Sequence, residues 1–255
     1  MDHKGPPLWQ RNGLSWSPYR SDILSLLHKA TVDECRLIPR GSNYTFLVTL
    51  SGADSGRSAA VYKPRSGEAP LYDFPDNTLY KREYAAYLVS QALGWNMVPP
   101  TIIRDGPHGV GSVQLFIEAD QRVHYFVFKD RQLAEVKKIA AFDFVTNNAD
   151  RKAGHCLEDY DGKIWLIDNG LTFNAAPKLR TVVWDFQGEE VPAEVVTDLE
   201  RLRRKLSGMG GLRTRLSSLL SQSEMKALQK RLDTLILTPE FPRPGYHRSV
   251  PWPPI

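Results

Sequence analysis

The stretch FDFVTNNADRKAGHCL, residues 142–157, runs from an apolar segment into a loop that concentrates charge. Asp150 leads this loop, and two cations, a glycine and His155 follow it within six positions. A second carboxylate, Asp168, ends the apolar run KIWLID, 18 residues after Asp150. An ionised group beside buried apolar segments is costly unless it is paired or used. The two acids therefore mark a candidate functional site.

Length and composition set the outer limits of the interpretation. A chain of 255 residues forms either one large domain or two small lobes. Its 42% hydrophobic and 24% charged residues are typical of a soluble globular protein. The net charge of +4 is compatible with ligands that carry phosphate, but it is too weak to indicate nucleic-acid binding.

Cysteine use and hydropathy predict a cytoplasmic protein without a transmembrane segment. The two cysteines, Cys35 and Cys156, have no metal-binding spacing and give no disulfide framework, which favours a reducing compartment. No apolar run approaches the roughly 20 residues of a spanning helix. The first 13 residues also lack the apolar core of a signal peptide.

The first half of the chain predicts a sheet with two helices. Ile23, Leu24, Leu26 and Leu27 show helical spacing, with Ser21 as the expected cap. Turn residues separate the next apolar runs, which indicates an antiparallel meander. The predicted elements are a helix at 17–30, strands at 34–40, 43–51 and 58–64, a helix at 79–95 ended by Gly94, and strands at 98–105 and 109–119.

The second half predicts helices around a small hairpin. A linker near 119–130 precedes a helix at 131–148, which is apolar nearly all round and therefore buried. Short strands are expected at 155–159 and 163–168, and helices at 193–206, 212–220 and 221–237. Ser223 is the expected start signal of the last helix. The basic run RLRRKL, 201–206, is expected on a solvated helix face. The tail 238–255 is rich in proline and is expected to be extended, packed across a surface or disordered.

This order predicts an α+β protein with two lobes, and a cleft between lobes is a natural ligand site. The N-terminal lobe is expected to be an antiparallel sheet plus a helix, and the C-terminal lobe to be mainly helical. The expected divisions are an N-terminal extension with a helix at 1–30, the N-lobe at 31–119, the C-lobe at 120–237 and the tail at 238–255.

Two further residues join the acids as candidates. Lys63 ends the run AAVYK, and Glu83 lies in the first turns of the following helix. Each residue taken alone has a simpler interpretation: a strand-end lysine in solvent, an acid favoured by a helix N-terminus, a cap or an Asx turn. Taken together, they fit phosphoryl transfer, in which a lysine holds phosphate oxygens, one carboxylate accepts a proton and another holds a metal.

Four segments in this order resemble the protein-kinase-like superfamily: VYKP, KREYAAYLVSQALG, FDFVTNNADRKAGHCL and IWLIDNGLTF. The match covers about residues 31–190 and is most similar to the bacterial phosphatidylinositol 3-/4-kinase-like family. The last two segments resemble the N-x-D-R and DNG segments of type II phosphatidylinositol 4-kinases, and also the loop of HipA-type serine kinases. The resemblance implies a two-lobed kinase fold that uses ATP and Mg²⁺ or Mn²⁺.

The resemblance also implies roles for single residues. Lys63 corresponds to the lysine on the α- and β-phosphates, and Glu83 to the glutamate that orients this lysine. Asp150 corresponds to the aspartate that accepts the hydroxyl proton, with Lys152 on the γ-phosphate. Asp168 corresponds to the acid that holds Mg²⁺.

Two segments are implied to contact other parts of the nucleotide. PRGSNYTF, 39–46, corresponds to the turn over the phosphates, with the N–H groups of Gly41 and Ser42 as donors. It has one glycine where the family has three. QLFIE, which contains Gln114, Phe116 and Glu118, corresponds to the interlobe strand whose backbone meets the adenine.

His155 departs from the family pattern, which has a metal-binding asparagine five residues after the catalytic aspartate. A neutral imidazole suits Mn²⁺ or Zn²⁺ better than Mg²⁺, whose preferred ligands are oxygens. Three functions therefore stay open: a kinase acting on a hydroxyl, a pseudokinase-like nucleotide-binding module, and an enzyme that transfers AMP. A protein or a small hydroxylated metabolite is at least as plausible an acceptor as a lipid.

Overall fold

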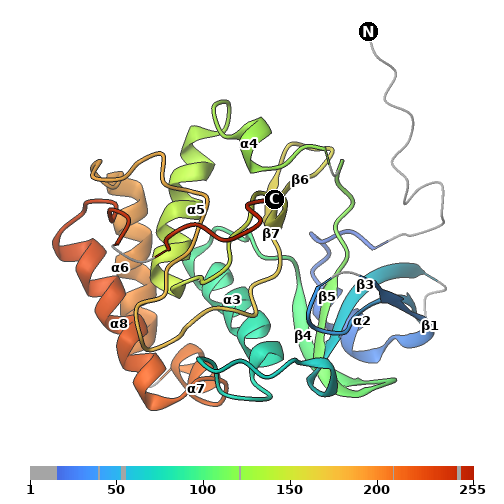
Figure 1. Cartoon of the computed structure of the whole chain (residues 1–255). Helices are drawn as coiled ribbons and strands as arrows, with labels where there is room; N and C mark the ends of the chain where they lie inside the picture. The colour runs from blue at the N-terminus through green and yellow to red at the C-terminus, as the bar shows by residue number, and fades with distance from the viewer. Residues whose placement is uncertain (1–15, 40, 53–55, 121, 209, 246–247) are drawn as a thin grey trace, which may run out of the picture.

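A computed structural model of the chain describes residues 16–39, 41–52, 56–120, 122–208, 210–245 and 248–255. A five-stranded sheet lies beside a helical body (Figure 1). Its strand order is β1-β2-β3-β5-β4, and every neighbouring pair is antiparallel. The predicted meander is confirmed. The strands are β1 (Thr31–Ile38), β2 (Thr45–Ser51), β3 (Arg57–Pro64), β4 (Thr101–Gly106) and β5 (Gly109–Leu115).

Helix α2 (Ile23–Lys29) packs on the sheet, and it is shorter than the sequence predicts. Its N-cap is Asp22 instead of the expected Ser21. Residues 17–22 form turns, in which the N–H of Arg20 bonds the carbonyl of Ser17 and the Arg20 guanidinium bonds Asp22. These local bonds compete with helix formation, so the helix begins later.

Helix α3 (Leu79–Leu93) lies between the sheet and the helical body (Figure 1). Gly94 ends it as predicted, in the left-handed conformation with φ +77° that favours glycine. Small and branched residues such as Ala85, Ala86 and Val89 are completely buried and belong to the hydrophobic cluster of the helical body. The predicted division at residue 119 therefore places α3 in one lobe although it packs against the other, and the division itself stays a prediction.

The helical body consists of α4 (Tyr125–Phe128), α5 (Leu133–Thr146), α6 (Ala193–Ser207), α7 (Gly211–Ser217) and α8 (Gln222–Leu237). The segment expected as a linker contains α4, because the fully buried Tyr125 and Phe128 anchor one helical turn there. Helix α8 begins after Ser221, not at Ser223. The Ser221 hydroxyl accepts the N–H of Glu224, whose carboxylate in turn accepts the Ser221 N–H.

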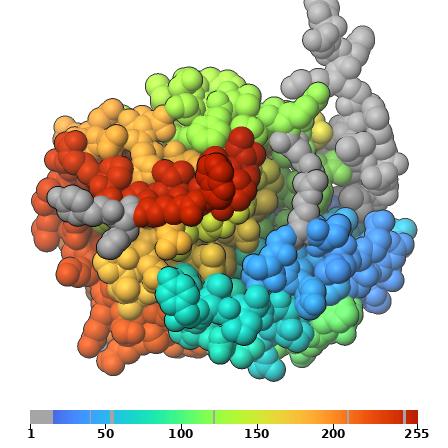
Figure 2. All heavy atoms as spheres, viewed as in Figure 1, coloured from blue at the N-terminus to red at the C-terminus, as the bar shows by residue number. Residues whose placement is uncertain are grey.

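Two remaining segments complete the fold. The predicted hairpin is present as β6 (Cys156–Glu158) and β7 (Ile164–Leu166). The described residues of the proline-rich tail are extended and pack across the surface, with Phe241 and Pro251 buried (Figure 2). Within the ranges that the structure describes, no helix has the length and apolar character to cross a membrane.

Candidate active site

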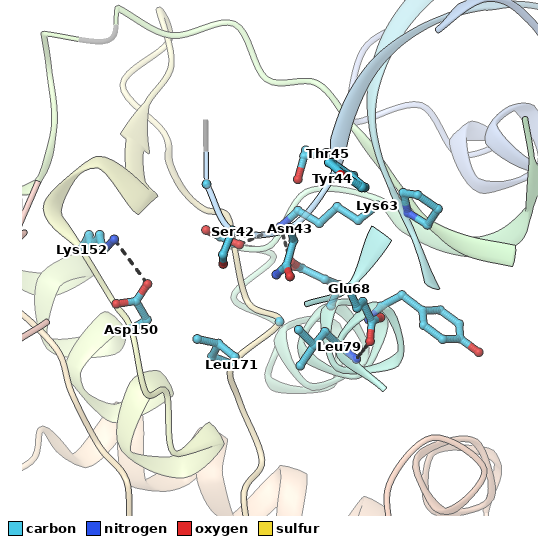
Figure 3. Close-up of a pocket in the computed structure, with 16 residues that line it drawn as sticks. Ser42, Asn43, Tyr44, Thr45, Lys63, Glu68, Leu79, Asp150, Lys152 and Leu171 are labelled. Carbon is cyan, nitrogen blue, oxygen red and sulfur yellow. Dashed lines mark hydrogen bonds and ion pairs between the residues drawn. The ribbon is translucent and has the colours of Figure 1, made fainter. Parts of the chain in front are cut away.

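A cavity of about 210 Å³ lies where the β1–β2 loop, the start of α3 and the loops around β6 and β7 meet (Figure 3). It brings together most of the residues predicted for the site, although they come from five separate parts of the chain. Of the predicted residues, Gly41, Ser42, Lys63, Glu83, Asp150, Lys152 and Asp168 line it. The other lining residues are Asn43, Tyr44, Thr45, Pro64, Glu68, Leu79, Tyr80, Gly170 and Leu171.

Lys63 connects the sheet to both neighbouring acids. From the end of β3 its Nζ donates to Glu83 on α3, and it lies 2.8 Å from Asp168 Oδ1. Burial opposes its charge, but the carboxylates of Asp168 and Glu83 outweigh burial and raise the pKa of Lys63. The lysine is therefore a fixed cation at the floor of the cavity.

Asp168 follows β7 in a constrained backbone conformation. Its φ of +56° lies in the left-handed region, which aspartate tolerates better than most residues but which still costs free energy. The Lys63 cation holds the pKa of the Asp168 carboxyl far below its usual range, although burial opposes this. The carboxylate stays ionised and is suited to binding a cation.

His155 lies beside Asp168. Its Nδ1 is 3.0 Å from the backbone carbonyl of Asp150 and 3.4 Å from the backbone nitrogen of Lys152. Its Nε2 is 3.3 Å from Asp168 Oδ2. Burial, assisted by the nearby cations and opposed by the Asp168 carboxylate, lowers the pKa of His155 to about 4, so the ring is neutral at pH 7.

A neutral imidazole nitrogen and a carboxylate oxygen in this arrangement can hold one divalent cation between them. The residues that the structure describes contain no group of three or more His, Cys, Asp or Glu side chains placed for a metal. The protein would supply two ligands here. Phosphate oxygens of a nucleotide and water would have to complete the shell, which is usual for metals that bind with a nucleotide.

Acid is expected to destabilise the fold through His155. The unfolded imidazole has a pKa of 6.5, against about 4 in the folded protein, so the unfolded state binds more protons between these values. The free energy of unfolding should fall by roughly 2–4 kcal/mol from pH 7 to pH 4 through this residue. His155→Asn should remove that part of the slope in urea unfolding. Equal slopes in the two proteins would contradict the assignment of a neutral ring.

Asp150 lies across the cavity from Lys63 (Figure 3). Its backbone N–H bonds the Asn148 side chain at 2.9 Å, and its Oδ2 is 3.6 Å from Lys152 Nζ. Burial raises the pKa of the Asp150 carboxyl, with a further rise from Asp168, while Lys152 opposes both. A carboxylate with a raised pKa that opens on the cavity is suited to accept a proton.

The loop over the cavity is held by hydrogen bonds instead of additional glycines. Gly41 has a φ of +99°, as expected for the turn; residue 40 of the predicted segment lies outside the described residues. The side chain of Asn43 accepts the Ala69 N–H at 2.7 Å, and the Tyr44 N–H bonds the Gly67 carbonyl at 2.9 Å. These bonds fix the loop against residues 67–69, which explains how one glycine is sufficient.

Glu68 is a site residue that sequence reasoning missed. Its carboxylate accepts the N–H groups of Leu79 at 3.0 Å and Tyr80 at 2.8 Å, so it caps α3 from outside the helix (Figure 3). This cap fixes the first turn of the helix that carries Glu83. No local signal marks it, because Glu68 lies 11 residues before the N–H that it caps.

Arg151 is a second missed residue, although it belongs to the N-x-D-R segment. It is completely buried, and its Nε lies 3.0 Å from Asp143 Oδ1 on α5. Its other nitrogens bond the Ile167 carbonyl at 2.9 Å and the Asn169 side chain at 2.7 Å. Arg151 thus bonds Ile167 and Asn169, the two residues that flank Asp168. These bonds fix Asp168 relative to Asp150, which precedes Arg151 in the chain.

The predicted adenine-contacting segment does not line the cavity. Gln114 bonds the Thr101 hydroxyl at 2.9 Å, and the Phe116 N–H bonds the Ala59 carbonyl at 3.0 Å. Glu118 follows the end of β5 and is also absent from the lining. Contact between this segment and an adenine stays a prediction.

The chain is similar to a known protein along nearly its whole length. The chain is 36% identical over 269 residues to protein Rv2133c of Mycobacterium tuberculosis (strain ATCC 25618 / H37Rv), which covers 92% of this chain and 96% of that protein. A stretch of 108 residues is 34% identical to phosphatidylinositol 4-kinase gamma 4 of Oryza sativa subsp. japonica, covering 35% of this chain and 19% of that protein. The chain matches no protein-family model.

Solved structures show the fold. The structure of hydra Fam20 with sugar superposes with a TM-score of 0.54 at 15% identity, covering 82% of this chain and 85% of that chain. The Golgi casein kinase with Mn/ADP bound superposes with a TM-score of 0.52 at 14% identity, covering 85% and 74%. The predicted α+β, protein-kinase-like fold is confirmed.

Proposed function

Because the chain belongs to the family of protein Rv2133c and has a protein-kinase-like fold, we propose that it is an ATP- and divalent-metal-dependent phosphotransferase acting on a hydroxyl group. One observation carries the proposal. Lys63 bonds both Glu83 and Asp168 in the same cavity onto which Asp150 opens. This is the charge arrangement that phosphoryl transfer requires.

The sheet side of the cavity binds the nucleotide in this proposal. Lys63 contacts the α- and β-phosphates, and Glu83 orients the lysine through their ion pair. The N–H groups of Gly41 and Ser42 donate to phosphate oxygens from the loop above. The end of β5 at Gln114, with Phe116 and Glu118 after it, is the proposed adenine side, since β5 pairs with β3, the strand that carries Lys63.

Asp168 and His155 hold the metal in this proposal. A divalent ion held there would neutralise negative charge on the phosphate oxygens. An imidazole nitrogen as one of the ligands would favour Mn²⁺ over Mg²⁺. The Golgi casein kinase of similar fold was solved with Mn/ADP, which supports a nucleotide and a divalent metal at such a site.

The helical side of the cavity contacts the acceptor in this proposal. Asp150 takes the proton of the attacking hydroxyl, for which its raised pKa is suited. Lys152 neutralises charge on the transferred γ-phosphate, and its ion pair with Asp150 keeps the two groups close together.

The identity of the acceptor is a further part of the proposal. The rice phosphatidylinositol 4-kinase segment supports kinship with that branch, but it covers only 35% of this chain. The HipA-type resemblance rests on the Asp150 loop alone. A protein or a small hydroxylated molecule is at least as plausible an acceptor as a lipid, because a shared fold does not fix the substrate. His155 also supports a second candidate, a nucleotide-binding module without turnover.

Nucleotide turnover with Mg²⁺ and with Mn²⁺ tests the proposal. We expect ADP formation by the wild-type chain to be faster with Mn²⁺, and His155→Asn to shift the preference toward Mg²⁺, because an amide oxygen replaces an imidazole nitrogen. Metal-dependent nucleotide binding, seen as a thermal shift, without ADP in either metal would support the binding module instead. Covalent transfer of AMP, seen by intact mass, would identify an AMP transferase.

A further inference from the structure

The end of the proline-rich tail rests on the loop that carries Asp150. The carbonyl of Pro254 accepts the N–H of Ala153 at 2.8 Å. Five residues earlier, the carbonyl of Ser249 accepts the Thr181 N–H at 3.0 Å and the Trp184 indole N–H at 3.1 Å. Figure 1 shows the C-terminal end beside β6 and β7, and Figure 2 shows the tail across the surface drawn in yellow.

These contacts fall on the two segments that build the Asp150 loop. Ala153 is the first residue of a short 3-10 helix, η2 (Ala153–His155), so it lies between Lys152 and the candidate metal ligand. Residues 180–182 hold Arg151 from the other side, because the Arg180 carbonyl accepts the Arg151 N–H and the Arg151 carbonyl accepts the Val182 N–H. The tail therefore contacts both segments: the Asp150 loop at Ala153 and the segment 180–182 at Thr181.

The composition of the tail suits this position. Residues 251, 253 and 254 are prolines, which have a carbonyl group but no N–H group. The segment therefore offers hydrogen-bond acceptors while having few N–H donors that need a partner. Proline also reduces the entropy that the tail loses when it is fixed on the surface. Ala153 is completely buried, so its N–H would be left without its protein acceptor if the tail were absent.

We propose that residues 248–254 are a positioning segment of the active site, which fixes Lys152 and His155 relative to Asp150 and Asp168. The inference rests on the proposed phosphotransferase function. The tail touches no reacting atom in this assignment. It acts through Ala153 and through the segment at Thr181, so its loss should affect the chemical step more than nucleotide binding.

A chain that ends at residue 247, together with the free peptide RSVPWPPI (248–255), tests the proposal. We expect the truncated chain to lose roughly 10- to 100-fold in kcat, with the KM for ATP changed less than about 2-fold, because misplaced catalytic groups slow chemistry at intact binding. Hydrogen exchange at residues 151–156 should be faster. Adding the peptide in excess should restore both kcat and protection.

A milder variant keeps the test valid if the truncated chain does not fold. Trp184→Phe removes one indole N–H that holds Ser249 and should speed exchange at residues 151–156. Its matched control is Trp95→Phe, which removes an indole N–H bonded to Asp198 at 2.6 Å, away from the tail. This control should leave that exchange unchanged.

Three results would overturn the positioning role: unchanged kcat with unchanged exchange in the truncated chain, a rise in kcat, or equal exchange in the two tryptophan variants. If the full chain forms no ADP with Mg²⁺ or Mn²⁺, the proposed function fails separately. The exchange measurements then still decide whether the tail fixes the loop.

Discussion

Asp150→Asn is expected to lower phosphotransfer by roughly 10²- to 10⁴-fold, the usual contribution of a positioned general base. Asparagine keeps the size of the side chain, and the backbone bond from residue 150 to Asn148 does not depend on the acid. The change therefore removes the proton acceptor without an obvious loss of structure. Single-turnover measurement of ADP formation and of acceptor phosphorylation checks the effect on the chemical step.

The binding of nucleotide separates this role from that of Asp168. Asp150 lies across the cavity from Lys63, so the thermal shift that ATP and metal produce should stay close to wild type in Asp150→Asn. Asp168→Asn should lose most of that shift, because it removes a partner of Lys63 and the proposed metal ligand. Asp161→Asn, in the exposed turn of the hairpin, is the matched control and should behave like wild type. Phosphotransfer within about 10-fold of wild type in Asp150→Asn would rule out Asp150 as the base.

The sequence predicts those site residues whose type and order along the chain already indicate a functional role. Lys63, Asp150 and Asp168 each end or follow an apolar run, and such charged residues stand out without any structure. Local chemistry also predicts element ends when the full local pattern is considered. Ser221 and Ser223 are equally good caps by type, but only Ser221 has a glutamate three residues later.

The parts that could not be predicted depend on partners far apart in the chain. Arg151 is recognisable as part of a loop motif, but its grip on both neighbours of Asp168 depends on how β7 returns to the loop. The composition of the tail predicts an extended chain, but nothing in it specifies Ala153 as its partner. Likewise, the predicted solvated face of residues 201–206 contains Arg201 and Lys205, which bond carbonyls at the end of α3.

Several long-range contacts fix α3, the helix that carries Glu83. Glu68 caps its first turn, and Arg201 and Lys205 bond the carbonyls of Leu93 and Ala92 at its last turn. Arg82, the residue before Glu83, bonds Glu224 on α8 and the Thr172 carbonyl. Helix α3 is thus fixed at both ends and next to Glu83, the partner of Lys63.

Arg82→Met is expected to have the largest effect on stability. The Arg82 guanidinium is buried, with 1% of its side chain exposed, and it pairs with Glu224 on α8, with 7% exposed. It also bonds the Thr172 carbonyl at 2.7 Å, just after the DNG segment. Methionine fills similar space but leaves the Glu224 carboxylate buried without its cation. The free energy of unfolding should therefore fall by roughly 3–5 kcal/mol, measured by urea unfolding.

Two further variants separate the buried charge from a general effect of losing an arginine. Arg82→Met combined with Glu224→Gln removes the unpaired charge while the amide still reaches the Ser221 N–H, so part of the lost stability should return. Arg203→Met breaks an exposed pair with Asp233, whose atoms lie 3.6 Å apart, and should cost less than about 1 kcal/mol. If Arg82→Met cost no more than Arg203→Met, α3 would not be locked by this pair, and the Lys63–Glu83 arrangement would have to be held by its two ends alone.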